Sequence, residues 1–335
     1  MNLPHLLRPL PLVALLATAV FADPTTLKIS HQFPGGTVDQ GDFRDRLCRK
    51  FAAEVEQRTA GALKFEIYPN SSLLKVNAQY NALRKGALDL ALIPLPYASG
   101  EIPELNISLM PGLVTNYAQA SRWKDAAVGR ELAAVMAEKG VVIISWVWQA
   151  GGVASRGKPI VSPEDAKGLK IRGGSKEMDL VLKAAGAAVL GIPSNEIYQA
   201  MQTGAIDAAI TSSTSLISFR LEEVSKALSS GGEHTYWFML EPLMMSKAVF
   251  ESLTPAQREI ILAVGVEMEK FGLQGAQADD TLVSKIFAKS GARVATLDAA
   301  AVAKWRAIAK DTAWSDYAAR SPRCAQLMTL AQQVP

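Results

Sequence analysis

The feature that most constrains the fold of this 335-residue chain is an internal duplication. Three short segments recur in the same order in two parts of the sequence, and each recurrence keeps its pattern of apolar residues. The matching pairs are 27–30 with 169–172, 63–69 with 188–193, and 83–92 with 201–210. Three matches in one order indicate that a single structural unit occurs twice.

The third pair predicts a helix, a glycine and a short buried strand. Ile197, Ala200 and Met201 follow helical spacing, and Gly204 can adopt the left-handed conformation that ends a helix. The segment after it is almost entirely apolar, as expected of a parallel strand covered on both faces. Two copies of a strand–helix–strand–helix–strand unit therefore predict an α/β fold with two similar domains, each built on an open, mostly parallel sheet.

Two apolar segments connect the copies. Residues 141–148 predict a buried strand, the glycine pair at 151–152 suits a crossing between domains, and residues 236–240 predict the return crossing. From about Thr254 the chain is mostly helical, with Pro255 at a helix start. The expected domains are domain I at 23–149 plus 237–276 and domain II at 150–236 plus 277–335.

The N-terminus has the pattern of a secretory signal peptide. Arg8 precedes an apolar run to Phe21, and Ala22 is a small residue at a suitable cleavage position. The run of about a dozen residues is shorter than the ~20 that span a bilayer, so we expect residues 1–22 to be cleaved. Export to an oxidising compartment makes a Cys48–Cys324 disulfide one alternative, and two buried free thiols the other.

Composition and motifs argue against metal chemistry. The net charge of +3 is too small to indicate nucleic-acid binding, and three His and two Cys leave little material for a metal site. His31 and His234 lie outside any metal-ligand pattern. Asp39, Asp42 and Asp45, which alternate with arginines, are interpreted as helix-dipole compensation and solvated ion pairs. No cofactor is expected.

Arg172 is the leading candidate for ligand binding. It ends an apolar strand and precedes Gly173 and Gly174, so its side chain should stand at the carboxyl end of a strand beside a tight loop. In open α/β sheets ligands bind outside these strand ends, and a guanidinium group there can hold a carboxylate through two parallel hydrogen bonds. A surface salt bridge is the alternative role.

Aromatic and polar side chains cluster near the same predicted strand ends. Ligand pockets combine an apolar, often aromatic lining with a few polar groups that fix orientation. The aromatic candidates are Phe33, Tyr97, Trp146, Trp148 and Trp237, and the polar candidates are Gln149, Asn195, Thr211, Ser212 and Ser213. Core packing is the alternative role for each aromatic residue. A hydrolase with Ser212 or Ser213 as nucleophile also stays open, because catalytic triads are assembled in space.

The mature chain resembles a known family over essentially its whole length. Residues 162–172, SPEDAKGLKIR, and residues 193–207, PSNEIYQAMQTGAID, are similar to segments of the DctP-type periplasmic solute receptors of TRAP transporters. The resemblance implies the two-domain periplasmic binding protein fold with a hinged inter-domain cleft, a periplasmic location and a long helix along both domains. It also implies that Arg172 holds the ligand carboxylate.

One segment departs from the family pattern. Many sialate and C4-dicarboxylate receptors carry a second arginine after the first crossing, whereas this chain has Ala150-Gly151-Gly152-Val153, and Thr211 stands where an Asn is common. The resemblance therefore favours a monocarboxylate, a hydroxy- or oxo-acid with an apolar or aromatic body. We expect a monomeric, non-enzymatic receptor that delivers this acid to a TRAP membrane permease. A receptor that feeds a sensor remains the alternative partner assignment.

Overall fold

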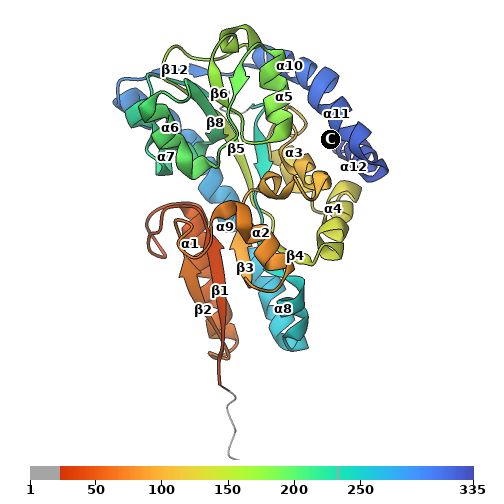
Figure 1. The fold of residues 1–335 in the computed structure, drawn as a ribbon. Helices are drawn as coiled ribbons and strands as arrows, with labels where there is room; N and C mark the ends of the chain where they lie inside the picture. Colours follow the sequence, from red (N-terminus) through yellow and green to blue (C-terminus); the bar gives the residue numbers. More distant parts are fainter. Residues whose placement is uncertain (1–22, 232–233) are drawn as a thin grey trace, which may run out of the picture.

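The computed structural model describes residues 23–231 and 234–335, so the predicted signal peptide at 1–22 lies outside the described residues. The chain forms two β-sheets with helices around them (Figure 1). The first sheet has the order β2-β1-β3-β11-β4. Its strands are β1 (Thr25–His31), β2 (Leu63–Tyr68), β3 (Leu90–Leu92), β4 (Val141–Ser145) and β11 (Leu243–Ser246).

The second sheet has the order β12-β9-β5-β8-β6-β7, and β10 adds to β5. Its strands are β5 (Trp148–Ser155), β6 (Lys170–Arg172), β7 (Ala188–Val189), β8 (Ala208–Ser212), β9 (Ala227–Ser230), β10 (Phe238–Leu240) and β12 (Arg293–Thr296). In the first sheet β1 is parallel to β2 and β3, and in the second β6 is parallel to β7 and β8. The predicted α/β fold with two domains is confirmed. The sheets are mixed and not mostly parallel, because β11 pairs antiparallel with β3 and β4, and β5 pairs antiparallel with β8, β9 and β10.

The duplication is visible in the strand pairing. The repeated strands lie in the order β2-β1-β3 in one sheet and β7-β6-β8 in the other, all parallel. The register is also repeated, because Ile29 pairs with Leu90 and Ile171 pairs with Ala208 at equivalent positions. The two copies therefore place Ser30 and Arg172 at the same point of their strands.

A repeated aspartate fixes each of these strand pairs. The backbone N–H of Lys28 donates to Asp89 Oδ2 at 2.7 Å, and that of Lys170 donates to Asp207 Oδ2 at 2.8 Å. Each carboxylate satisfies a backbone donor at the start of its strand pair through a charge-assisted hydrogen bond. The aspartate in the sequence match thus has a structural role in both copies.

Helices cover both sheets. α1 (Phe43–Arg58) and α2 (Val76–Arg84) belong to the first repeat, whereas α5 (Lys176–Ala184) and α6 (Ile197–Thr203) belong to the second. Gly204 ends α6 with φ of 78°, the left-handed conformation expected from the sequence. The remaining α-helices are α3 (Tyr117–Arg122), α4 (Ala127–Glu138), α7 (Ser213–Ser218), α8 (Lys247–Ser252), α10 (Ala299–Ala309), α11 (Ser315–Arg320) and α12 (Pro322–Gln332).

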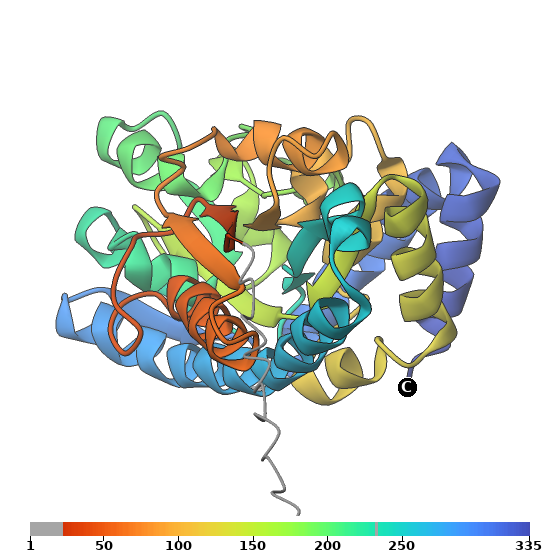
Figure 2. The same cartoon turned by 90° about the horizontal axis from the view of Figure 1, so that it is seen from below.

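One long helix, α9 (Pro255–Lys289), links the two domains. Thr254 caps it by accepting from the backbone N–H of Gln257, as the Thr-Pro start predicts. It packs against α1 and β4 as well as β5, α7, β9 and β12, and Figure 2 shows it running along the molecule beneath both groups of elements. Across the described residues, none of the helices has the length and apolar character needed to cross a membrane.

The chain crosses between the sheets twice, at positions that differ slightly from the predicted ones. The segment 141–148 forms two strands, and the first crossing lies between β4 and β5. The second crossing lies between β10 and β11, where the N–H of Glu241 donates to Val147 O at 2.7 Å. Gly151 and Gly152 lie inside β5 and not at a crossing. Glycine is needed at both positions, because a Cβ would come within 2.5 Å of a neighbouring strand's carbonyl oxygen.

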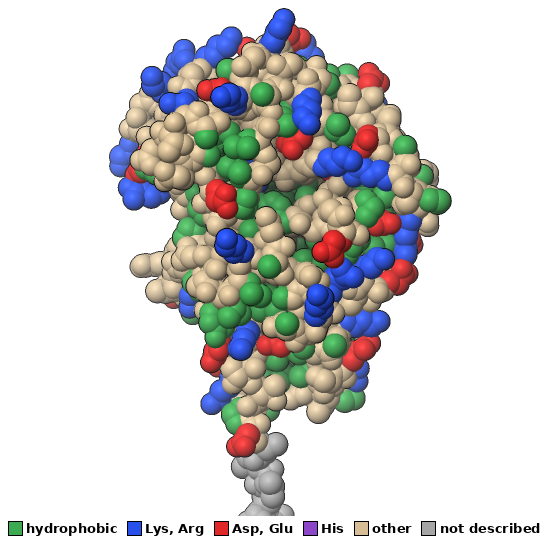
Figure 3. Space-filling view, in the orientation of Figure 1, with side chains coloured by type: hydrophobic (Ala, Val, Ile, Leu, Met, Phe, Trp, Pro, Cys, Tyr) green, Lys and Arg blue, Asp and Glu red, His purple; other side chains and the backbone are tan. Residues whose placement is uncertain are grey.

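Both cysteines are buried free thiols, so the disulfide alternative is wrong. Cys48 packs with Leu47 and Phe51 in the core beneath the first sheet, whereas Cys324 packs in a different core cluster that includes Tyr317. On the surface shown in Figure 3, basic and acidic side chains are interspersed, in keeping with the small net charge.

The repeated aspartates give a stability prediction. Asp89→Ala and Asp207→Ala each remove a charged acceptor from a backbone N–H, so we expect each to lower the free energy of unfolding by about 1–3 kcal/mol. Asp39→Ala is the control, because the Asp39 side chain is 84% exposed, and it should change stability by less than about 0.5 kcal/mol. Urea denaturation measures all three variants. Equal stability of the repeat variants and the control would contradict the role assigned to the repeat.

Candidate ligand-binding site

A small cavity lies between the two domains, and its walls leave a volume of only about 10 Å³ between them. Its walls come from residues at the carboxyl ends of β3, β6 and β8, together with α1, β10 and the second crossing. They are Arg44, Pro94, Tyr97, Leu109, Arg172, Gly174, Ser194, Thr211, Ser212, Ser215, Trp237, Met239 and Glu241. The cavity is therefore at the strand ends where open α/β sheets bind their ligands.

Arg172 is buried in the wall of this cavity, and only neutral oxygens hold its guanidinium group. Its side chain is 2% exposed. Nε donates to Ile192 O at 3.0 Å, Nη1 donates to Ile210 O at 2.9 Å, and Nη2 hydrogen-bonds with Tyr97 Oη at 2.9 Å. These bonds use three of the five N–H groups of an arginine and leave one on each terminal nitrogen.

The charge of Arg172 has no close acidic partner. Among the described residues, no carboxylate lies within 4 Å of its guanidinium group. Asp179 of α5 interacts with Arg172 only at longer range, and burial raises the pKa of that carboxyl to about 6. Because an uncompensated buried charge costs several kcal/mol, this wall of the cavity is suited to an anion.

Tyr97 joins the two domains at the Arg172 end of the cavity. It lies on the short 3-10 helix Leu95–Ala98 that follows β3, so it belongs to the first repeat. Its hydroxyl oxygen also accepts from the backbone N–H of Ser194 at 3.0 Å, in the second repeat. A single phenol oxygen therefore contacts both Arg172 and the opposite domain.

Arg44 is a second buried arginine in the cavity wall, but its charge is already balanced. Nε donates to Asp42 Oδ1 at 2.9 Å and Nη2 to Asp42 Oδ2 at 2.7 Å, which makes a bidentate pair. Nη1 donates to Ser215 Oγ at 3.1 Å and to Glu241 Oε2 at 3.3 Å. Burial alone would lower the pKa of Arg44, yet these carboxylates hold it above its usual value.

The interpretation of Asp42 and Asp45 as solvated is wrong. Both carboxylates are buried, because Asp42 caps α1 while binding Arg44, and Asp45 contacts His31 Nε2 at 3.1 Å and Arg49 Nε at 2.7 Å. Of the three aspartates, only Asp39 is exposed as expected. From this helix start, Arg44 lines the cavity, and Asp42 holds it there.

Glu241 is a buried acid at the second crossing. Its Oε2 accepts from Gln149 Nε2 and from Arg44 Nη1, while Oε1 has no hydrogen-bond partner among the described residues. Burial raises the pKa of Glu241 to about 7, against the opposing effect of Arg44. The cavity thus contains one unpaired basic group and, elsewhere in its wall, one acid with an unused oxygen.

The structure brings five of the predicted residues into the cavity wall: Arg172, Tyr97, Thr211, Ser212 and Trp237. Three others lie outside that wall but are buried close to it. Gln149 bonds to Glu241, the Phe33 ring stacks under the Arg44 guanidinium at 3.5 Å, and Ser213 bonds to Asp280. Asn195 is exposed, and its neighbour Ser194 faces the cavity instead.

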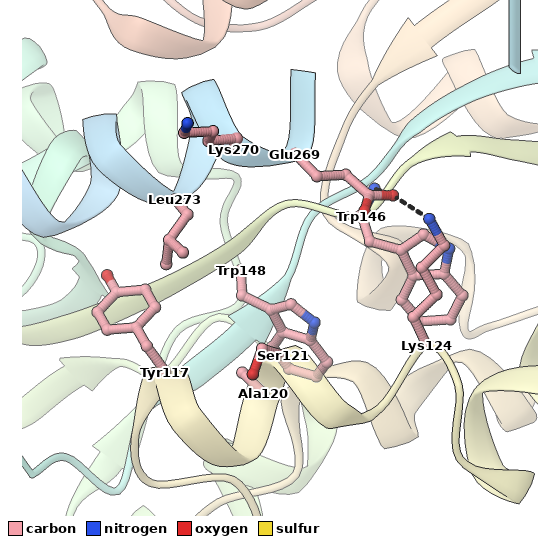
Figure 4. Close-up of a pocket in the computed structure, with 9 residues that line it drawn as sticks. All are labelled: Tyr117, Ala120, Ser121, Lys124, Trp146, Trp148, Glu269, Lys270 and Leu273. Carbon is pink, nitrogen blue, oxygen red and sulfur yellow. Dashed lines mark hydrogen bonds and ion pairs between the residues drawn. The ribbon is translucent and has the colours of Figure 1, made fainter. Parts of the chain in front are cut away.

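Trp146 and Trp148 lie in a different pocket from Arg172. This pocket is at the hinge, between α3 and α9, and Figure 4 shows the two indole rings there with Tyr117, Leu273 and the Lys124–Glu269 ion pair. Trp146 begins the first crossing, and its backbone N–H donates to Glu269 Oε1 at 3.1 Å. The turn of the chain between the sheets therefore directs both rings to the hinge.

Arg44 and Glu241 are site residues that the sequence interpretation missed. Arg44 follows an N-capping aspartate, so its charge looked local. Glu241 is the single charged residue in the otherwise apolar stretch from Tyr236 to Met245. An isolated acid in a buried segment is unusual, and that signal could have found Glu241.

In the segment 150–153, where the resemblance would place a second arginine, neighbouring residues leave no room for a side chain at Gly151. A Cβ at Gly151 would lie 2.3 Å from Thr211 O and 2.4 Å from the Trp237 ring. Trp237 therefore packs directly on the backbone at this point and occupies space beside the cavity. A larger residue at Gly151 would displace the indole ring.

Comparison with known proteins identifies the family. The model of bacterial extracellular solute-binding protein family 7, DctP, matches residues 37–320. The chain belongs to this family. A solute-binding protein of Albidiferax ferrireducens is 65% identical over 313 residues, which are 93% of each chain. The 2,3-diketo-L-gulonate-binding periplasmic protein of Escherichia coli is 28% identical, over 78% of this chain and 80% of that protein.

Solved structures show the same relationship. A TRAP periplasmic solute-binding protein from Rhodoferax ferrireducens, with bound malonate, is 65% identical and superposes with a TM-score of 0.91, over 92% of this chain and 98% of that one. A TRAP solute-binding protein from Sulfitobacter, with bound β-D-galacturonate, is 23% identical with a TM-score of 0.83, over 92% and 99% of the two chains, which shows a shared fold. The predicted resemblance to TRAP receptors is confirmed, and the family consists of periplasmic receptors.

The raised pKa of Glu241 predicts a pH dependence of stability. The folded protein retains a proton at Glu241 up to about pH 7, whereas the unfolded carboxyl loses it near 4.5, so the free energy of unfolding falls as pH rises between these values. Glu241→Gln removes this titration. Between pH 4.5 and 7.5, wild type should lose on the order of 1–3 kcal/mol more stability than Glu241→Gln.

Urea denaturation across this pH range measures the difference between the two proteins. Glu101→Gln is the control, because its side chain is 61% exposed, and its stability should follow the wild-type pH dependence. Parallel curves for wild type and Glu241→Gln would contradict the protonation assigned to Glu241.

Proposed function

We propose that this protein is the receptor of a TRAP transporter that binds one organic-acid carboxylate at Arg172 and delivers the acid to a membrane permease. The observation that carries the proposal is the buried guanidinium group of Arg172, which has free N–H groups and no carboxylate within 4 Å among the described residues. A ligand carboxylate would supply the missing charge and accept a bond from each terminal nitrogen.

The cavity favours a small acid with one carboxylate. The cavity is small, and both oxygens of Asp42 already accept hydrogen bonds from the guanidinium group of Arg44. Trp237 fills the space beside Gly151, in the segment where the resemblance to sialate and C4-dicarboxylate receptors would place a second arginine. We therefore propose a monocarboxylate, either a hydroxy- or an oxo-acid with an apolar body. The 65% identical relative has bound malonate, which is a small organic acid with two carboxylates.

Closure of the domains would explain how binding is signalled to a permease. Tyr97 links Arg172 and Ser194, and Arg44 reaches Ser215 of the other domain, so residues of both domains surround the ligand position. A ligand that contacts both domains stabilises the closed form over the open one. We propose the domain boundaries given by the sequence, with the hinge at the two crossings, and a monomeric receptor.

The geometry gives less support to a hydrolase. The Ser212 hydroxyl bonds to Ser215 and Arg44, and the Ser213 hydroxyl bonds to Asp280. Among the described residues neither serine hydrogen-bonds to a histidine, which a serine nucleophile normally uses as its base. The receptor function therefore accounts better for this cleft.

Ligand-dependent thermal stability tests the proposal. Among small organic acids, at least one monocarboxylate should raise the melting temperature, since a ligand at 100 times its Kd stabilises the folded state by about 3 kcal/mol. Arg172→Met should abolish this shift while the circular dichroism spectrum stays that of wild type. Arg156→Met, which replaces an exposed arginine, is the matched control and should retain the full shift.

The proposal fails if no carboxylate raises the melting temperature of the wild-type protein. It also fails if Arg172→Met binds the same acid with wild-type affinity in isothermal titration calorimetry.

A further inference from the structure

We propose that Glu241 selects ligands that carry a hydroxyl group, so that the preferred acid is a hydroxy monocarboxylate rather than an oxo-acid or a dicarboxylate. This inference rests on the proposed function, because it concerns the same cavity. Glu241 lies in a part of the cavity wall that Arg172 does not form.

The carboxyl group of Glu241 offers a fixed, unused acceptor. The side chain is fully buried in the cavity wall, and Arg44 and Gln149 hold Oε2. The backbone N–H is held by Val147 O at 2.7 Å. Oε1 is therefore positioned but unsatisfied, and a buried acceptor without a donor costs about 1–3 kcal/mol.

Trp237 provides the complementary donor. Its side chain is 2% exposed, it lines the same cavity, and its indole Nε1 has no hydrogen-bond partner among the described residues. A hydroxyl group can donate to Glu241 Oε1 and can accept from an indole N–H. A ketone can only accept, and a methylene group can do neither, so only the hydroxyl can satisfy both atoms.

The charges around Glu241 disfavour a second carboxylate. Arg44 contributes one positive charge, and the acidic side chains of Asp42 and Glu241 both contact it. Asp279 of α9 is a third acid that interacts electrostatically with Asp42 and Arg44. The guanidinium fork of Arg44 is closed by Asp42. A second ligand carboxylate would thus be repelled by acidic groups and would find no free guanidinium N–H pair on Arg44. A neutral hydroxyl group could instead donate to Glu241 Oε1.

Isothermal titration calorimetry with a matched set of acids tests the inference at pH 8.5, where the Glu241 side chain, with its pKa of about 7, is ionised and can only accept. The probes are 2-hydroxybutanoate, 3-hydroxybutanoate, butanoate, 2-oxobutanoate and malonate. For wild type, one of the two hydroxy acids should bind about ten-fold or more tighter than butanoate, 2-oxobutanoate and malonate, because each of those leaves Glu241 Oε1 without a donor. In Glu241→Gln, whose amide can donate to a ketone, the preference over 2-oxobutanoate should fall about ten-fold.

Two further variants keep the result interpretable. Glu177→Gln changes another fully buried glutamate, one that contacts Asn106 and Arg320 outside the cavity, and it should retain the wild-type preference. Trp237→Phe keeps the aromatic ring but removes the N–H, so it should reduce the preference for the hydroxy acid over butanoate. It supplies the second test if Glu241→Gln does not fold.

The outcomes separate this inference from the proposed function. Arg172-dependent binding in which hydroxy acids and butanoate have equal affinities, or in which malonate binds most tightly, overturns the role of Glu241 alone. An unchanged hydroxyl preference in both Glu241→Gln and Trp237→Phe also overturns it. If the wild-type protein binds none of these carboxylates, the proposed function itself is overturned.

Discussion

The buried guanidinium group of Arg172 is the interaction on which the organisation of the cleft depends. Two backbone carbonyls and one phenol oxygen orient it, but none of these groups carries a compensating charge. A charge held in this way is costly to bury, so the closed arrangement of the two domains is favoured when an anion occupies the cavity. In the function proposed above, the same feature attracts the ligand and favours closure.

The duplicated fold explains how one arginine reaches this position. The second repeat places Arg172 at the end of β6, where the Lys170–Asp207 hydrogen bond and the pairing with β8 fix the strand. The equivalent residue of the first repeat is Ser30, which is also buried. The two domains thus share a framework and differ at the strand end that carries the charge. The first domain contributes Arg44 and Tyr97 from segments outside the matched strands.

Much of this arrangement could be predicted from the sequence, because it depends on local patterns. The repeat predicted two similar α/β domains, and the strand-end position of Arg172 predicted that it faces the cleft. Glu241 and Arg44 were missed because their roles arise only when the two crossings and α1 come together. Trp146 and Trp148 were expected beside Arg172, but the path of the first crossing turns them toward α9. Sequence periodicity gives the face of a strand, but it does not give the direction of the chain between two sheets.

The most direct test of the central claim is a crystal structure of the mature protein with a bound organic acid, grown without carboxylate buffers or precipitants. We expect electron density for one carboxylate group in the inter-domain cavity, with its two oxygens accepting from the terminal nitrogens of Arg172. An acid bound elsewhere, such as in the hinge pocket beside Trp146, with Arg172 still contacting only Ile192, Ile210 and Tyr97, would contradict it.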